Sequence, residues 1–109
     1  MDLQHYKNNI YIAGKISPTD IQSLVDDYGF SAIVNNRIDD EEEGQPKSTT
    51  IATACKDSGV EYYHLPMRDR QDITAEAMAT RDELLKKHQE KNILFFCRTG
   101  GRSEALLNH

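Results

Sequence analysis

Residues 93–105, reading ILFFCRTGGRSEA, constrain the fold of this chain more than any other segment. Four apolar residues open it, the length and composition typical of a strand buried on both faces. Cys97 follows at the end of that strand. A loop with glycines at 100 and 101 comes next, and residues 103–107 favour a helix. These features predict an anion-binding nest, because backbone N–H groups converge there and the helix dipole adds positive potential.

A thiol at the mouth of such a nest is expected to be a nucleophile. A helix start and nearby guanidinium groups favour the thiolate of Cys97 near neutral pH. Arg102 can fold back toward whatever the sulfur holds, and its planar fork suits an oxyanion. We therefore expect Cys97 and Arg102 to be catalytic. The alternative is that Cys97 is a small apolar residue ending a core strand. The remaining loop residues are expected to bind the anion, although the side chain of Arg98 should point outward: Arg98, Thr99, Gly100, Gly101 and Ser103.

The loop sequence CRTGGRS resembles the Cys-Arg-x-Gly-x-Arg active loop of rhodanese-type sulfurtransferases. It is also similar to the loop of cysteine phosphatases, but those place their arginine six positions after the cysteine, where Ser103 stands here. A second segment, residues 33–37 with 42–46 after it, resembles the phosphatase-like domain of bacterial beta-lactamase-hydrolase-like proteins. The resemblance spans nearly the whole chain, from Tyr11 to Leu107. That family combines a dual-specificity-phosphatase-like fold with a rhodanese-like loop and is described both as sulfurtransferase and as phosphatase.

Strand and helix patterns alternate along the chain, which predicts an α/β fold with a parallel sheet and helices on both faces. We expect one domain over residues 1–109. Four strands and four helices are expected, the last helix being short enough to be marginal unless it packs. The strands are expected at residues 10–13, 32–35, 60–66 and 93–96, and the helices at 17–28, 48–58, 75–90 and 103–107 with Ser17 and Ser48 or Thr49 as caps. The family resemblance implies the strand order 1-4-2-3, with the Cys97 strand central.

Two loops hold further candidates. Residues 39–43 are five consecutive acids, typical of a solvated surface segment, with the alternative that one of them orients Arg37 or Arg102. Arg37 follows the second strand at the carboxyl edge, where open α/β sheets bind ligands. In the loop at 67–73, resemblance to tyrosine phosphatases makes Asp69 or Asp72 a candidate general acid. The alternative is that these acids cap a helix or pair with neighbouring arginines.

The composition and net charge of the chain argue against several classes of binding partner. A net charge of -5 without a basic stripe argues against nucleic acid, and the longest apolar run, 93–97, is too short to cross a membrane. The first residues lack a secretory signal, so we expect a cytoplasmic protein. Cys55 and Cys97 have neither metal spacing nor a disulfide framework, so no metal or cofactor is expected. Cys55 is expected in the core, and His64 as a satisfied histidine rather than a site residue.

Whether the nest suits sulfur transfer or phosphate hydrolysis depends on the volume that it encloses. A cysteinyl-phosphate presents three oxygens to backbone donors, whereas a persulfide presents one terminal sulfur. A loop shortened by one residue loses an amide, so the Cys-x4-Arg spacing favours a sulfurtransferase that carries a persulfide on Cys97. The alternative is a phosphatase that forms a phosphoenzyme on Cys97. The third hypothesis is a catalytically idle oxyanion-binding module. Each takes a small anion: thiosulfate, a persulfide or a phosphate ester.

Overall fold

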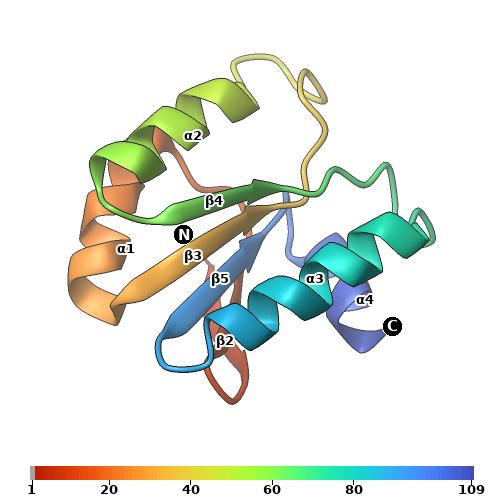
Figure 1. Cartoon of the computed structure of the whole chain (residues 1–109). Coiled ribbons are helices and arrows are strands. Elements are labelled where there is room, and N and C mark those ends of the chain that lie inside the picture. The colour runs from red at the N-terminus through yellow and green to blue at the C-terminus, as the bar shows by residue number, and fades with distance from the viewer. Residues whose placement is uncertain (1) are drawn as a thin grey trace.

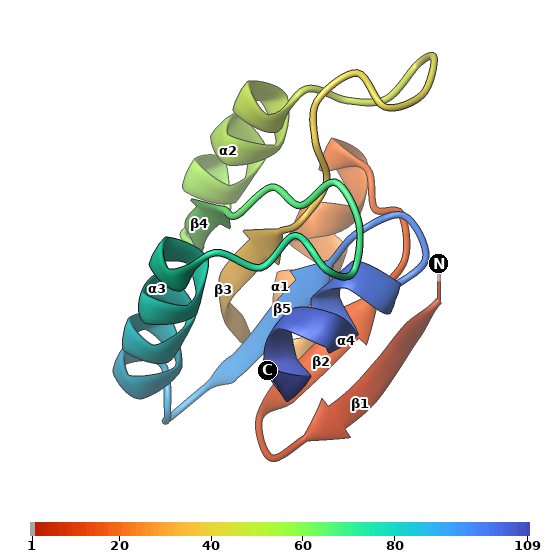
Figure 2. The ribbon, with the colours of Figure 1, turned by 90° about the vertical axis from the view of Figure 1, so that its right-hand side faces the viewer.

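The computed structural model describes residues 2–109 and contains a mixed sheet with helices on both faces (Figures 1 and 2). Five strands form the sheet: β1 (Leu3–Lys7), β2 (Ile10–Ala13), β3 (Phe30–Asn35), β4 (Glu61–His64) and β5 (Asn92–Phe96). A 3-10 helix and four α-helices connect them: η1 (Pro18–Asp20), α1 (Ile21–Tyr28), α2 (Ser48–Asp57), α3 (Ala75–Lys87) and α4 (Gly101–Asn108). In Figure 1, α1 and α2 lie on one side of the sheet and α3 and α4 on the other.

The strand order is β1-β2-β5-β3-β4, and the last four strands are parallel. These four are the predicted strands in the expected order 1-4-2-3, with β5 between β2 and β3. The expected count of four strands was wrong. The fifth strand, β1, pairs antiparallel with β2 at the sheet edge, after a turn in which Asn8 has φ 52°. Three of its five side chains are exposed, so it carries no buried alternation that a sequence pattern reveals.

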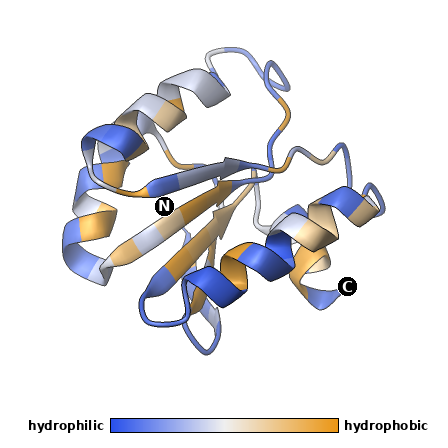
Figure 3. Cartoon of the chain, viewed as in Figure 1, coloured by the Kyte–Doolittle hydropathy of each residue, from blue (hydrophilic) through white to orange (hydrophobic). Residues whose placement is uncertain are grey.

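Strand β5 divides the core into two halves because its successive side chains point to opposite faces. Leu94 and Phe96 join the cluster beneath α1 and α2. Ile93 and Phe95 join the cluster beneath α3 and α4. The central strands are accordingly the most apolar part of the ribbon in Figure 3, while the outer helix faces are hydrophilic. Burial on both faces fixes the end of β5, and with it the position of Cys97.

Helix boundaries follow local signals except at α2. Gly29 ends α1 in the left-handed conformation, with φ 66°. The side chain of Ser48 or Thr49 was expected to cap α2, but neither of them does. Instead the Asp39 carboxylate accepts a hydrogen bond of 2.7 Å from the backbone N–H of Ser48. The cap therefore comes from the acidic run nine residues earlier, which ties that run to the body of the protein.

Arg81 is buried against the end of α4. Its guanidinium donates to the carbonyl of Leu106 at 2.6 Å and to that of His109 at 3.1 Å. It also pairs with Asp82 at 2.8 Å. These carbonyls lie in the last turn of α4, where helix carbonyls lack partners within the helix. A cation from α3 therefore supports the short helix that begins at the nest.

Candidate functional site

The nest lies at the carboxyl end of β5, as its sequence predicted. The backbone N–H of Cys97 donates to the carbonyl of Ala13 at 3.3 Å, which fixes the end of β5 against β2. The loop then turns back, and the backbone N–H of Gly100 donates to Cys97 Sγ at 3.0 Å. Gly100 has φ 92°, a conformation that L side chains rarely adopt, so glycine is required for this turn. We call Cys97, Thr99, Gly100, Arg102 and Ser103 the thiolate nest.

The nest favours the ionised sulfur. Burial is the largest single influence on Cys97 and by itself would raise its pKa. Backbone N–H groups of Ser103, Thr99, Arg102 and Gly100 act in the opposite direction by hydrogen bonding to the sulfur. Their combined effect is larger, so the pKa of Cys97 is lowered from its ordinary value. A thiol with a lowered pKa is the expected property of a nucleophilic cysteine.

Arg102 folds back over the nest, with its side chain 12% exposed. Its guanidinium donates to both carboxylate oxygens of Glu41, at 3.1 and 2.8 Å, and to the carbonyl of Met67 at 2.8 Å. Burial alone would lower the pKa of Arg102, but Glu41 and the Cys97 sulfur raise it, so the cation is retained. Burial likewise opposes ionisation of Glu41, and the hydrogen bond and charge of Arg102 lower its pKa overall. The pair is therefore ionic.

Part of the acidic run folds toward the site, while Asp40 and Glu43 are exposed. We call residues 38–47 the acidic loop. Arg37, nearly fully buried, donates to Glu42 and to Gln45, each at 3.0 Å. Its Nε lies 3.5 Å from Glu41 Oε1, beyond a hydrogen bond, and is a buried nitrogen without a partner. The alternative interpretation of the acids is therefore the correct one: Glu41 contacts Arg102 and Glu42 contacts Arg37.

The Glu42 carboxylate pairs with three cationic side chains at the rim of the nest. It pairs with Lys15 at 2.8 Å, with Arg37 at 3.0 Å and more loosely with Arg98 at 3.5 Å. The hydrogen bonds from Lys15 and Arg37 lower its pKa to about 2. Arg98 is 53% exposed and points away from the sulfur, as expected. A groove of about 250 Å³ runs beside this cluster, lined by Lys15, Ser17, Asp20, Arg37 and the acidic loop.

A buried hydrogen-bond chain fixes the first turn of α4. The hydroxyl of Ser103 donates to the side-chain oxygen of Asn36 at 2.8 Å, and the Asn36 amide donates to the carbonyl of Leu65 at 2.8 Å. Asn36 itself is anchored because its backbone N–H donates to Phe96 at 2.8 Å. Three strand ends therefore hold the helix start that supplies two of the nest's four donors. Ser103 contributes both its backbone N–H and this side-chain anchor.

Asp69 and Asp72 are engaged within their own loop. The Asp69 carboxylate accepts from the backbone N–H of Gln71 at 2.9 Å, and that of Asp72 accepts from Arg68 at 2.8 Å. Helix α3 is capped instead by the hydroxyl of Thr74, which accepts from Ala77 at 3.0 Å. The carboxylates thus organise the loop backbone. A role for either as general acid stays a prediction.

The other two candidates lie where they were expected. Cys55 is fully buried in the core, and burial raises its pKa to about 12. His64 is half-buried, and its Nε2 lies 2.7 Å from the carbonyl of Arg37, so it supports the start of the acidic loop.

Sequence reasoning missed three contributors to the site. They are Asn36, which holds Ser103, the carbonyl of Met67, which holds Arg102, and Arg70, which lies against Gly101. Only Asn36 had a usable signal, its place directly after a buried strand. The other two depend on how the loop at 66–73 folds over α4.

Within residues 2–109, none of the helices combines the length and apolar character needed to cross a membrane. In the same part of the chain, no three side chains of His, Cys, Asp or Glu gather as a metal site would require.

Solved structures define the class to which this fold belongs. A protein from Neisseria meningitidis, provisionally named a phosphatase, is 29% identical with a TM-score of 0.76, covering 93% of this chain and 70% of its own. A second provisionally named phosphatase, from Shewanella putrefaciens, is 19% identical with a TM-score of 0.74, covering 97% of this chain and 64% of its own. TpbA from P. aeruginosa, solved with pTyr, shares the fold at 15% identity and a TM-score of 0.62, covering 90% of this chain and 54% of its own. The fold is that of cysteine phosphatases.

The family follows from a match along the whole chain. Residues 2–108 match the model of the beta-lactamase hydrolase-like protein, phosphatase-like domain, and the chain belongs to that family. Comparison with curated proteins found no match. The chain spans less than two thirds of the length of the Shewanella protein. The resemblance inferred from CRTGGRS and the second segment is thus confirmed.

Proposed function

We propose that this protein is a cysteine-dependent phosphatase that hydrolyses phosphate monoesters through a phosphoenzyme on Cys97. The observation that carries the proposal is the number of backbone donors around the sulfur. Four N–H groups, from Thr99, Gly100, Arg102 and Ser103, stabilise it despite the short Cys-x4-Arg loop. The argument for sulfur over phosphate assumed that the shorter loop has too few donors. Four donors and the Arg102 fork are enough for three phosphoryl oxygens.

The residues divide the reaction between them. The Cys97 thiolate attacks phosphorus and displaces the alcohol, which leaves with a proton; water then attacks the cysteinyl-phosphate and releases inorganic phosphate. Arg102 and the nest N–H groups stabilise the charge on the transferring group. Ser103 and Asn36 keep the donors in place. Asp69 and Asp72 are the candidates for the proton donor to the alcohol.

The comparisons support this choice. The three solved structures named above carry phosphatase names or a pTyr ligand, and none of the three is named a sulfurtransferase. A phosphate monoester is therefore the first substrate class to test. The sulfurtransferase reading still has the six-residue loop in its favour, since its Cys-x4-Arg spacing is that of rhodaneses.

Substrate entry requires a change in the acidic loop. Cys97 is fully buried, and Glu41 occupies the terminal nitrogens of Arg102. An incoming phosphate therefore has to displace the Glu41 carboxylate from that fork. The carboxylate occupies the fork in the way that two phosphoryl oxygens would.

One set of assays decides between the reactions. Phosphate release from an aryl phosphate and sulfur transfer from thiosulfate would be measured on the wild type, Cys97→Ser and Arg102→Lys, with Arg98→Lys as the matched control. We expect phosphate release that Cys97→Ser abolishes and that Arg102→Lys lowers at least a hundredfold in kcat, while Arg98→Lys retains most of it. Mass spectrometry of acid-quenched enzyme should show a phosphoryl group on Cys97.

Each other result overturns the proposal. A sulfur adduct on Cys97 after thiosulfate, without phosphate release, identifies a sulfurtransferase. The absence of both reactions in protein whose Cys97 still reacts rapidly with iodoacetamide identifies an idle anion-binding module. Phosphate release that survives in Cys97→Ser rules out the phosphoenzyme.

A further inference from the structure

Arg70 lies against the outer wall of the thiolate nest. A methyl group built on Gly101 would lie 2.6 Å from Arg70 Nη2 and 3.0 Å from both its Cζ and its Nε. The guanidinium therefore lies over the Cα of Gly101, in the space that a side chain at this position would enter. Gly101 is the first residue of α4, directly between Gly100 and Arg102 of the nest. The Arg70 head group thus lies beside the anion site.

The charge of Arg70 is not neutralised by an acid. Within residues 2–109, no carboxylate oxygen lies within the 4.0 Å ion-pair distance of its guanidinium. The other cations at the rim are paired: Arg102 with Glu41, and Lys15, Arg37 and Arg98 with Glu42. Arg70 is exposed, so its outer N–H groups are open to a ligand. An anion arriving at the nest meets this cation without displacing a carboxylate.

The acids of the same loop do not change this arrangement. Asp69 and Asp72 face backbone N–H groups of Gln71 and Arg68 rather than Arg70. Their contacts shape the loop so that it descends from β4 toward the start of α4, as Figure 2 shows. The loop backbone therefore carries Arg70 to Gly101. The sequence also allowed Arg70 to be a surface arginine that pairs with the acids of its own loop. That alternative does not describe this contact.

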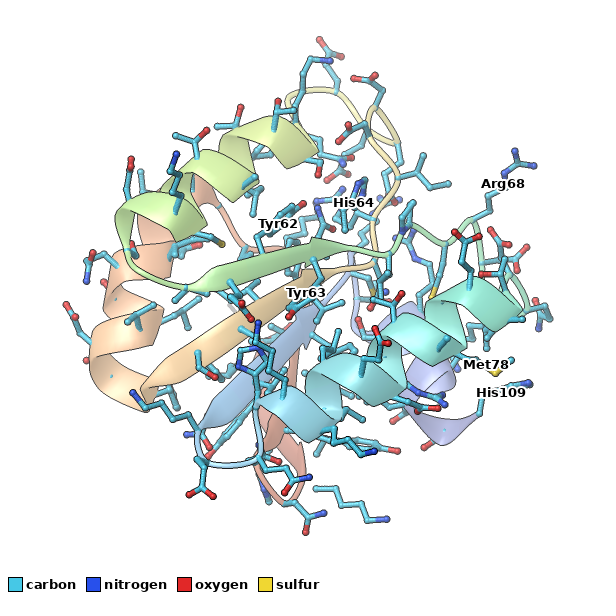
Figure 4. The ribbon with its side chains drawn as sticks, in the orientation of Figure 1. Tyr62, Tyr63, His64, Arg68, Met78 and His109 are labelled. Atoms are coloured by element: carbon cyan, nitrogen blue, oxygen red, sulfur yellow. The ribbon has the colours of Figure 1, made fainter. Side chains whose placement is uncertain are left out.

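Arg68 provides the contrast. It belongs to the same loop and has the same charge, but its side chain extends away from the protein into solvent (Figure 4). Its backbone N–H makes the hydrogen bond to Asp72, so its side chain is not needed for the loop conformation. Arg68 and Arg70 thus differ in whether the side chain lies against the nest.

We propose that Arg70 is a specificity-determining residue that binds a second anionic group of the substrate, beside the group held in the nest. The inference rests on the proposed function, because it takes the group in the nest to be a phosphoryl group. It names the substrate class more closely: a phosphate monoester that carries a carboxylate or a second phosphate a few bonds from the ester. The guanidinium suits either group, since both accept two parallel N–H hydrogen bonds.

The test uses binding rather than turnover. Cys97 is alkylated with iodoacetamide in the presence of 3-phosphonopropionate or of propylphosphonate, which has the same chain length but lacks the carboxylate. The concentration that halves the alkylation rate is measured for the wild type, Arg70→Gln and Arg68→Gln, and peptide mass spectrometry confirms that Cys97 is the residue modified. Melting temperatures of the three proteins show whether the substitutions leave the fold intact.

We expect 3-phosphonopropionate to protect wild-type Cys97 at about three- to fivefold lower concentration than propylphosphonate, the range of an exposed ion pair. Arg70→Gln should remove this advantage and leave protection by propylphosphonate within about twofold of the wild type. Arg68→Gln should retain the advantage. A merely structural role for Arg70 predicts that both phosphonates weaken together, which would overturn the proposal.

The remaining outcomes separate this inference from the proposed function. Equal protection by the two phosphonates in the wild type overturns the role of Arg70, while the phosphatase proposal stands. An Arg70-dependent advantage in a protein that hydrolyses no phosphate ester overturns the phosphatase proposal and leaves Arg70 as part of an anion-binding site. A nest that neither phosphonate protects, at concentrations up to saturation, overturns both.

Discussion

At the scale of single residues, the Glu41 carboxylate occupies the terminal nitrogens of Arg102 that the proposed phosphate substrate would need. Both of its oxygens accept from the terminal nitrogens of Arg102, which is the bidentate geometry of guanidinium with carboxylate or phosphate. Because its pKa is lowered, Glu41 stays ionised at neutral pH and would both repel and block the dianionic substrate proposed above. The carbonyl of Met67 holds Arg102 Nη1 independently of Glu41. Arg102 therefore keeps one anchor when Glu41 leaves.

We predict that Glu41→Gln increases the affinity for anions. The neutral amide is a weaker partner for Arg102 and no longer repels phosphate, so the KM for an aryl phosphate should fall about threefold to tenfold. Glu43→Gln is the matched control, since Glu43 belongs to the same acidic run but is exposed. Steady-state kinetics of both variants at pH 7 would test this. A KM that rises tenfold in Glu41→Gln, with the control unchanged, would instead show that Glu41 holds Arg102 in its binding position.

At the scale of secondary structure, α4 depends on α3. Its first turn supplies two of the four nest donors, the N–H groups of Arg102 and Ser103, and its last turn receives the Arg81 guanidinium. A helix this short is marginal by itself, so tertiary contacts decide whether it forms. Buried hydrogen bonds from a charged group contribute about 1.5 to 3 kcal/mol each. Arg81 is therefore a large part of what orders the nest.

We predict that Arg81→Met lowers the free energy of unfolding by about 2 kcal/mol, because the carbonyl of Leu106 loses its charged donor and keeps only the longer hydrogen bond from the backbone N–H of His109. In a protein of this size that corresponds to a fall in Tm of roughly 10 °C. Lys86→Met, on the exposed face of α3, removes the same charge without the contacts and should change Tm little. Thermal unfolding followed by circular dichroism measures both. Equal melting temperatures for the two variants would contradict the assigned role.

The elements were predictable from sequence where burial leaves a pattern. β5 is apolar on both faces, and the glycine loop and helix start after it signal the nest, so Cys97, Arg102 and Ser103 were found together. β1 was missed because an exposed edge strand needs only its hydrogen bonds to β2. The acidic loop was misjudged because Glu41 is paired with an arginine 61 residues later in the chain. Such pairs depend on which strand ends meet, and a run of acids by itself is typical of solvent.

At the scale of the whole molecule, charged clusters tie both edges of the sheet. The acidic loop gathers cations at the carboxyl edge, as described above. At the opposite edge, Glu61 of β4 pairs with Lys87 at 2.6 Å and with His88 Nε2 at 2.5 Å. His88 Nδ1 lies 2.8 Å from the hydroxyl of Ser31 on β3, so the end of α3 is joined to two strands. Both clusters contain carboxylates that are ionised in the folded protein.

These carboxylates make the fold sensitive to acid. The hydrogen bonds from Lys87 and Tyr63 lower the pKa of Glu61 to about 2 from an ordinary value of 4.5, and that of Glu42 is lowered equally far. The folded state thus binds fewer protons than the unfolded chain between these values. Their stabilising effect is fully present above pH 4.5 and is lost as the pH falls toward about 2. The free energy of unfolding should therefore decline across this window.

We predict that Glu61→Gln reduces this decline, because the variant no longer carries the group whose protonation weakens the cluster. Glu61 is partly exposed, so solvent screening limits the difference to no more than about 1 kcal/mol. Urea unfolding at several pH values between 2.5 and 6 would measure it, with Glu90→Gln as the exposed control. The variant should be less stable than the wild type at pH 6 and approach it at pH 2.5, and salt should narrow the gap at pH 6 because screening weakens exposed pairs. Parallel pH curves for the variant and the wild type would show that Glu61 titrates alike in both states and that other groups control acid unfolding.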